Sequence, residues 1–315
     1  MPYQYSQTPS LSSMFDVIAL GDITTDIFFN LDDKKSELYS LDTLGNWLRL
    51  RYGRKIPVKT MAKVYGAGNA GNVAVGLARL GYKSAVAATI GADEAGIATK
   101  KTLQREKVNT QFVAVDKKLP TNVSVILDYA GERTILAHHE ERAYSLPELR
   151  EGGWVYFSSI RGGEGIYQSI KSAVRKKKLK LAVNPGSYQL TAGRKQLLSV
   201  LTAAEILFVD MEEAEMLTKR RGNGKKMLEA LARLGPRVVV VTDGRRGSYC
   251  FDGCTMYHIG IFDFPVVEKT GCGDAYASGF TAALMSGESI PEAMRWGSVN
   301  AAHTAMEIGS HEGLL

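Results

Sequence analysis

The sequence has no long hydrophobic run, and this absence bears on where the protein works. No apolar stretch among its 315 residues approaches the roughly 20 residues that a membrane-spanning helix needs. Residues 1–13 are polar and lack the basic region and apolar core of a secretory signal. We therefore expect a cytoplasmic protein without a membrane partner.

Cysteine is also scarce. Cys250, Cys254 and Cys272 cannot form a disulfide framework, and the first two lack a second ligand pair that would make a zinc site. We expect all three to be reduced thiols. A composition of 45% hydrophobic and 23% charged residues excludes disordered and fibrous classes, and the length suits one large α/β domain.

Basic residues are in modest excess over acidic ones, and the formal net charge is +6. The basic residues fall in short separate runs, such as residues 175–178 and 219–221, and no nucleic-acid-binding motif accompanies them. Such runs at helix ends are usually solvated. We expect no nucleic-acid partner, and a mildly basic surface also suits an enzyme that binds a polyanion such as ATP.

The most informative stretch is a glycine-rich turn at residues 270–273, which leads into a helix of small residues. The first amides of a helix lack intrahelical partners and lie at the positive end of its dipole, so such a turn favours a bound phosphate. Asp274 at this helix start can take a proton from an attacking hydroxyl. The alternative is structural, with Asp274 only a helix cap and the glycines only a tight turn.

Residues 268–280 resemble the signature of the ribokinase-like (PfkB) carbohydrate kinases, Asp-Thr-x-Gly-Ala-Gly-Asp followed by a small-residue helix. The resemblance implies that Asp274 is the catalytic base. It also implies that the amides of Gly271, Cys272 and Gly273 form an anion hole, with Thr270 beside the nucleotide. Glu268 takes the place of the family's first Asp, which in many members helps to organise a monovalent-cation site, so K+ is a candidate activator whose site is altered here.

Residues 16–22 predict a buried strand that ends in polar residues, and ligands bind at the carboxyl ends of strands in open α/β sheets. The resemblance places a sugar-binding carboxylate at Asp26, although a turn-capping role is the alternative. It also implies a small β-sheet lid, from residues 26–65 and 111–143. Within the first segment, residues 31–64 are irregular and leave room for a helical insertion or a dimer contact.

Residues 122–128 and 133–138 predict a hairpin with one buried face. Neighbouring residues on a strand point to opposite faces, so at most one of His138 and His139 faces the substrate. We expect substrate specificity to depend on basic residues in and near the lid, namely Arg133, His138, Arg142 and Arg161.

Residues 66–71 satisfy Gly-x-Gly-x-x-Gly, which also occurs in dinucleotide-binding proteins and protein kinases. The protein-kinase motifs His-Arg-Asp and Asp-Phe-Gly are absent, whereas Asp93 keeps a dinucleotide site open. The stretch also resembles the family's first signature, which implies that Gly68 and Asn72 contact the substrate, with Ala67 in place of a glycine. Close packing of the following helix is the structural alternative.

Further resemblances concern the nucleotide and the metal. They assign to ATP the residues Asn184, Thr242, Gly244, Gly247 and Asn300, the last of them beside adenine. Asp210 and Glu213 correspond to the family's Asn-x-x-Glu, which acts on Mg²⁺ through water, and we group Glu268 with this metal set. Helix-dipole partners for the acidic pair and a plain hairpin for residues 242–248 are the alternatives.

The alternation of strands and helices predicts a mostly parallel, doubly wound sheet. We expect residues 1–315 to form a single ribokinase-like domain, a three-layer α/β/α fold with the small lid, that transfers a phosphoryl group from MgATP to a hydroxyl of a sugar or sugar derivative. A nucleoside kinase of the same family is the nearest alternative, and an NAD-dependent oxidoreductase or a binding-only relative is more distant. The lid could also pair two copies into a homodimer.

Overall fold

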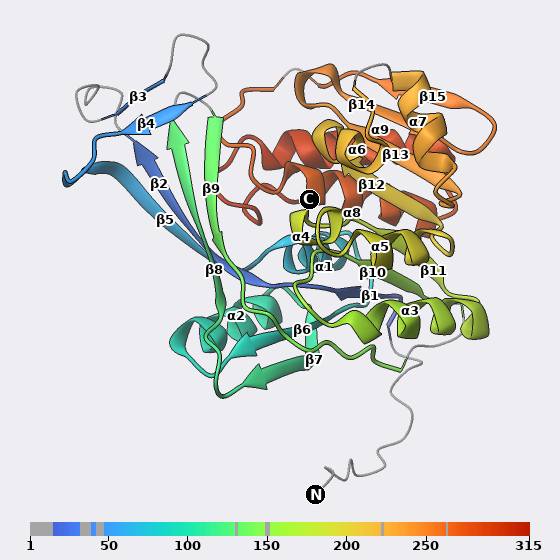
Figure 1. Ribbon diagram of the computed structural model, residues 1–315, viewed down its shortest axis with the longest axis horizontal. Helices are drawn as coiled ribbons and strands as arrows, with labels where there is room; N and C mark the ends of the chain where they lie inside the picture. Colours follow the sequence, from blue (N-terminus) through green and yellow to red (C-terminus); the bar gives the residue numbers. More distant parts are fainter. Residues whose placement is uncertain are drawn as a thin grey trace, which may run out of the picture.

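The computed structural model describes residues 15–31, 39–41, 47–129, 132–148, 152–221, 224–262 and 264–315. In this part of the chain the strands form a nine-stranded sheet, a four-stranded sheet and a two-stranded ribbon (Figure 1). Helices cover the large sheet, while the four-stranded sheet extends away from it at one side. The ribokinase-like α/β architecture that the sequence predicts is thereby confirmed.

The large sheet has the strand order β15-β14-β13-β12-β11-β10-β1-β6-β7 and is parallel from β7 to β13. Strands such as β13, with four consecutive valines, are buried on both faces, as parallel sheets require. The chain runs outward from β1 in both directions, so the strand order reverses there. The strands are β1 Val17–Leu20, β6 Ser84–Gly91, β7 Asn109–Asp116, β10 Trp154–Phe157, β11 Lys180–Val183, β12 Ile206–Asp210, β13 Val238–Thr242, β14 Ser248–Phe251 and β15 Met256–Ile259.

Two separate hydrophobic cores lie on the two faces of the large sheet. The first contains residues of α1 Asn69–Arg79, α2 Glu94–Arg105, α8 Cys272–Met285 and α9 Ile290–Thr304. The second contains residues of α3 Glu164–Lys177, α4 Ser187–Leu190, α5 Arg194–Leu201, α6 Met211–Thr218 and α7 Gly224–Ala232. Among the described helices, none combines the length and the apolar composition that crossing a bilayer needs.

The four-stranded sheet, which we call the lid, has the order β5-β2-β8-β9. Its strands are β2 Thr24–Leu31, β5 Val58–Ala67, β8 Asn122–Tyr129 and β9 Glu132–His138. The register of β8 and β9, with Asp128 opposite Arg133, confirms the predicted hairpin. Along β9, Arg133, Ile135 and Ala137 line a pocket between the lid and the large sheet, because alternate residues share one face.

The predicted second lid segment begins too early. Residues 111–116 belong to β7, which pairs in parallel with β6 of the large sheet, so the lid resumes only at Asn122. The pattern of alternating apolar residues is the same in both sheets and did not distinguish them. In the first segment, the ribbon pairs β3 Tyr39–Leu41 with β4 Leu48–Leu50. Residues 32–38 and 42–46, where a helical insertion was considered, lie outside the described residues.

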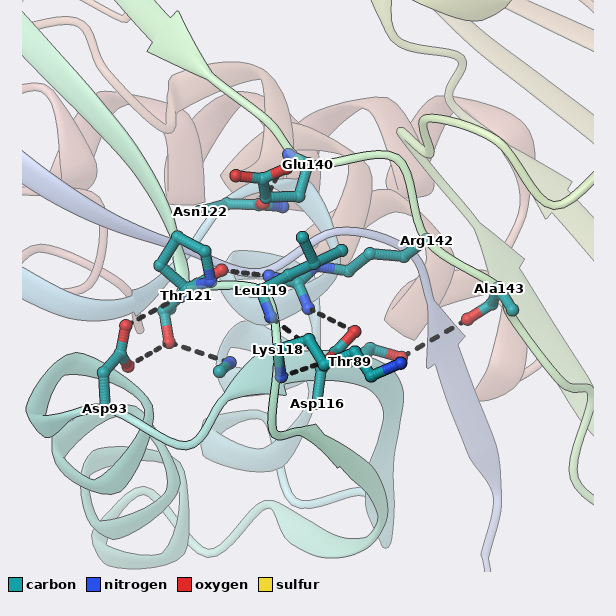
Figure 2. A network of polar contacts seen from close by, with 12 residues as sticks. Thr89, Asp93, Asp116, Lys118, Leu119, Thr121, Asn122, Glu140, Arg142 and Ala143 are labelled. Carbon is teal, nitrogen blue, oxygen red and sulfur yellow. Dashed lines mark hydrogen bonds and ion pairs between the residues drawn. The ribbon is translucent and has the colours of Figure 1, made fainter.

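One chain connection leads from β7 to the β8–β9 hairpin, and a second leads from the hairpin to β10. A polar network fastens both connections to the large sheet (Figure 2). Asp93 caps α2 and accepts hydrogen bonds from the amide of Thr121 at 2.8 Å and from its hydroxyl at 2.6 Å. The Arg142 guanidinium, almost fully buried, donates to the carbonyl of Pro120 and lies 3.6 Å from Asp116. We call residues 116–122 and 139–144 the hinge segments.

Candidate active site

A pocket with a volume of about 590 Å³ lies at the carboxyl ends of β1, β10, β11, β12 and β13, beneath the lid. This is the edge at which ligands bind in doubly wound sheets. The residues that sequence analysis assigned to the site and that line this pocket are Asp26, Gly68, Asn72, Arg133, Arg161, Asn184, Asp210, Glu213, Thr242, Thr270, Gly271, Gly273 and Asp274. We call Gly271, Gly273, Asp274, Asp210 and Glu213 the transfer end of the pocket.

Asp274 lies in the first turn of α8, where a side chain of α1 reaches each of its oxygens. The Asn69 amide donates to Oδ1 at 3.0 Å, and the Asn72 amide donates to Oδ2 at 2.7 Å. Burial raises the pKa of Asp274 to about 6, against the lowering effects of the two asparagines and of nearby Arg133. The carboxylate is therefore held in one orientation and close to the proton affinity that a general base needs near neutral pH.

The two glycines of the transfer end differ in what surrounds them. Gly271 precedes α8 with φ +85°, and a Cβ there would lie 2.7 Å from the Cβ of Ser310. A Cβ on Gly273 would meet nothing within 4 Å. Gly271 is thus required by the turn itself, whereas Gly273 leaves open space in front of the helix N-terminus, where an anion can approach the amides.

Asp26, in β2, is buried and lines the pocket. Burial raises its pKa to about 6, partly offset by the hydroxyl of Thr24, which donates to Oδ1 at 2.6 Å. Nearby, the Oδ1 of Asn72 is buried and has no hydrogen-bond partner. Asp26 and Asn72 therefore offer acceptor oxygens for substrate hydroxyls. Gly68 lies close enough to the β1–β2 connection that a Cβ would be 3.0 Å from the carbonyl of Asp22.

Asp210 and Glu213 form a capping box at the start of α6. The Glu213 amide donates to Asp210 Oδ1 at 2.8 Å, and the Asp210 amide donates to Glu213 Oε2 at 2.9 Å. Burial, and then the charge of Asp210, raises the pKa of Glu213 to about 8. Each carboxylate keeps one oxygen outside the box. This donor set fits Mg²⁺, which takes few protein carboxylates and completes its shell with water and phosphate.

Five predicted residues lie outside the pocket wall. Gly244 and Gly247 form the turn of the β13–β14 hairpin, which was the structural alternative. Cys272 belongs to the first turn of α8, so it can contribute its amide but not its side chain to the wall. Glu268 is buried, accepts hydrogen bonds from the amide and the hydroxyl of Thr270, and does not line the pocket as Asp210 and Glu213 do. Among the described residues no cluster of three or more acidic, His or Cys side chains forms a metal site.

Asn300, which the sequence analysis expected beside adenine, does not line the pocket. It is buried on α9, where its amide donates to the carbonyl of Ala275 at 2.8 Å and to the Ser278 hydroxyl at 3.1 Å. Its oxygen accepts from the amide of Leu315. The amide and the oxygen of this side chain thus link α9 to α8 and to the last residue of the chain.

The other end of the pocket, near the hinge segments, holds the predicted Arg161. Sequence reasoning missed Asp22 and Ser159 there and did not choose between His138 and His139. We call Asp22, His139, Ser159 and Arg161 the hinge end. Asp22 is buried; it accepts a hydrogen bond from the Tyr144 hydroxyl and lies 3.1 Å from Nδ1 of His139. The polar residues that follow the first strand were a signal for Asp22. His139 is the member of the histidine pair that lines the pocket, while His138 is 69% exposed.

The dinucleotide alternative loses its structural support here. Asp93, which would bind a ribose, caps α2 and holds Thr121 of the hinge segment, and it does not line the pocket. Asn69, within the same Gly-rich stretch, also escaped sequence analysis. It follows Gly68 directly, and its amide donates both to Asp274 and to Asn184 at 3.2 Å.

The site therefore combines an open helix start, a carboxylate beside it and an acidic pair whose oxygens suit Mg²⁺, an arrangement compatible with phosphoryl transfer. Residues 40–314 match the family model described as pfkB family carbohydrate kinase, and the chain belongs to that family.

The chain resembles individual members at modest identity. It is 27% identical over 229 residues to a fructokinase of Salmonella typhimurium, covering 68% of this chain and 75% of the relative. It is 25% identical over 285 residues to a 5-dehydro-2-deoxygluconokinase of Shouchella clausii, covering 84% and 87%. The structure of Arabidopsis thaliana ribokinase complexed with ribose and ATP superimposes with a TM-score of 0.74 at 20% identity, covering 95% of both chains, which shows the shared fold.

Proposed function

We propose that the protein transfers the γ-phosphoryl group of MgATP to a hydroxyl group of a sugar derivative. The observation that carries this proposal is the position of Asp274, hydrogen-bonded by Asn69 and Asn72 beside the open helix start at Gly273. A base and an anion site next to each other are what an in-line phosphoryl transfer needs. The fructokinase and the ribokinase named above support the same class of reaction.

In this mechanism Asp274 accepts the proton of the acceptor hydroxyl. The hydroxyl oxygen forms a bond to the γ-phosphorus while the bond from that phosphorus to the bridging oxygen of ADP breaks. The first amides of α8 stabilise the charge on the transferred group, and Arg133, whose charge already acts on Asp274, adds to this stabilisation. The products are the phosphorylated sugar derivative and ADP, with the proton on Asp274.

Asp210 and Glu213 would hold the magnesium ion, and Asn184, Thr242 and Thr270 line the pocket beside them. When bound, the ion supplies charge neutralisation on the phosphate oxygens. The lid residues Ser124 and Ile126 close the pocket from the opposite side. We propose that this cover excludes water, which would otherwise compete as the phosphoryl acceptor.

A nucleoside acceptor is less well supported. The aromatic side chains of the described lid strands are Phe28, Phe29, Tyr65 and Tyr129, and none of them lines the pocket. The pocket wall contains Tyr188 and Phe208, which lie outside the lid. Phe28 is only 3% exposed and belongs to the core. The lid face above the pocket instead carries Ile126, Ile135 and Ala137. Their side chains are aliphatic and offer no aromatic ring on which a base could stack.

The test is the release of ADP from MgATP in the presence of candidate acceptors, with and without potassium. The panel contains pentoses, hexoses, sugar acids, sugar phosphates and ribonucleosides. Asp274→Asn should lower kcat with the active acceptor by about 100- to 10,000-fold, the usual contribution of a general base, and keep ATP binding.

Glu288→Gln, on an exposed residue just after α8, is the matched control and should keep full activity. Retention of normal turnover in Asp274→Asn would remove this residue from the mechanism. ATP binding without ADP release across the whole panel would favour a binding protein over a kinase.

A further inference from the structure

We infer that the acceptor is an anionic sugar derivative, whose carboxylate or phosphate binds Arg161, beside His139, at the hinge end. This inference rests on the proposed kinase function and adds a substrate class to it. Arg161 follows β10, lines the pocket and is exposed. Its Nη1 donates to the carbonyl of His139 at 2.7 Å, and among the described residues no carboxylate lies within ion-pair distance of it. Most of its five N–H donors are therefore left for a ligand.

His139 is fixed next to Arg161 by its own hydrogen bond. A carboxylate can only accept, so Nδ1 of His139 carries the proton toward Asp22 at 3.1 Å. The other oxygen of Asp22 accepts from the Tyr144 hydroxyl, so this buried negative charge is already satisfied on both oxygens. It therefore opposes an incoming anion less than an unpaired carboxylate would.

The network of Figure 2 holds the segment that carries His139 in place. The amide of Glu140 donates to Asn122 Oδ1 at 2.9 Å, and the guanidinium of Arg142 donates to Pro120. The amide of Arg142 also donates to the carbonyl of Arg161 at 3.1 Å. The backbones of His139 and Arg161 are thus fastened to each other and to the large sheet before any ligand arrives, which lowers the cost of ordering them on binding.

The charges around the pocket favour an anion at the hinge end. Arg133 enters from the lid, and its charge acts on Asp274 at the transfer end. Arg161 follows β10 of the large sheet, and the carboxylate of the hinge end is Asp22, whose two oxygens are both hydrogen-bonded. A planar guanidinium with free donors matches a carboxylate or phosphate in two parallel hydrogen bonds, and a neutral sugar gives it no such partner.

The experiment compares three acceptors by calorimetry, with MgAMP-PNP present in place of ATP. They are fructose, fructose 6-phosphate and 2-keto-3-deoxygluconate, so that a neutral sugar, a phosphate and a carboxylate are represented. At least one anionic ligand should bind more tightly than fructose, and which one does so identifies the anionic group. Arg161→Gln should weaken that ligand by about 30- to 1,000-fold, the usual effect of truncating one partner of a charged pair, and leave the affinity for fructose unchanged.

Arg175→Gln removes the same charge from an exposed position on α3 and should change none of these affinities. Arg161→Lys keeps the charge without the planar fork and should lie between wild type and Arg161→Gln. The inference is wrong if fructose binds as tightly as both anions, or if Arg161→Gln behaves like Arg175→Gln. It is also wrong if Arg161→Gln weakens the nucleotide and not the anionic ligand, because Arg161 would then serve the phosphates of ATP.

The outcome can be separated from that of the proposed function. Tight, Arg161-dependent binding of an anion with no ADP release on MgATP would support the anion site and defeat the kinase. ADP release with neutral sugars alone would support the kinase and defeat the anion site.

Discussion

The two ends of the pocket differ in what holds their charged side chains. At the transfer end, Asp274 is buried, and its two oxygens accept from Asn69 and Asn72. At the hinge end, Arg161 is exposed, and its guanidinium is tied to the protein through one backbone carbonyl. The first arrangement fixes a group that must meet a reacting atom in one geometry, and the second keeps donors free for a ligand. On the proposed function and the inferred anion site, chemistry and selectivity belong to different parts of this pocket.

The largest effect should come from a methyl group at the transfer end. Gly273→Ala places a Cβ where the protein has no atoms within 4 Å, in the space that the phosphoryl group would use. We expect kcat/KM to fall on the order of 100-fold, as for a displacement of about 1 Å, with an unchanged melting temperature.

Gly271→Ala is the contrasting variant. Its Cβ meets Ser310 at 2.7 Å, and the backbone has φ +85°, so the loss should appear as about 1–3 kcal/mol of stability. Chemical denaturation together with steady-state kinetics of both variants checks the pair. Equal stability losses in the two proteins would mean that Gly273 is as structural as Gly271.

The next effect is the pH dependence of the transfer end. Burial raises the pKa of Asp274 and of Asp26 to about 6, and Asp274 must be ionised to accept a proton. Activity should therefore fall about tenfold for each pH unit below 6 and level off above it. A pH profile of kcat/KM measures this. Asp26→Asn should keep the acid limb if Asp274 causes it, and loss of the limb in that variant would reassign it to Asp26.

The same shift predicts an opposite trend in stability. A carboxyl whose pKa is raised from 3.8 to about 6 on folding favours the folded state below 3.8, and this contribution is lost as pH rises through 6. Wild type should thus lose stability relative to Asp274→Asn between these values. Denaturation of both proteins across the range is the measurement, and a constant difference would show that the pKa of Asp274 is not raised.

A smaller effect is expected at the acidic pair. Glu213→Gln removes the negative charge of one carboxylate from the proposed magnesium site. The Mg²⁺ concentration for half-maximal activity should rise about tenfold. Glu212→Gln, on the exposed side of the same helical turn, is the control. Magnesium titrations at saturating ATP decide the matter, and identical curves for the two variants would place the ion elsewhere.

The smallest effect belongs to the hinge end. Tyr144→Phe removes the hydroxyl that donates to Asp22, so that the carboxylate and its partner His139 are held less firmly. We expect the KM of the acceptor to rise about fivefold, equivalent to one hydrogen bond, with kcat unchanged. The fully exposed Tyr52 supplies the control Tyr52→Phe. A drop in kcat instead of a rise in KM would show that the hinge end takes part in the chemistry.

Local motifs explain why the transfer end could be read from the sequence. Gly271, Gly273 and Asp274 are neighbours in the chain, so the turn, the helix start and the carboxylate arise from one short segment. The large sheet was equally accessible, since each strand is a short apolar run before a helix. The matching pattern of β7 and β8 shows the limit, because alternation does not say which sheet a strand joins.

The hinge end depends on contacts between distant segments, which no single stretch reveals. Asp22 and His139 are 117 positions apart, and only the fold brings them together. Arg142 was grouped with the specificity residues because it is charged and close to the lid, yet its side chain is buried in the hinge. For Asn300 the sequence did not reveal that the side chain is buried and hydrogen-bonded to α8.

Three residues separate the end of β1 at Leu20 from the start of β2 at Thr24, and β2 carries Asp26 into the small sheet. Any swing of that sheet relative to the large one must therefore displace a carboxylate that faces the ligand. On the proposed function, the stiffness of the three linking residues would therefore affect how quickly the product leaves.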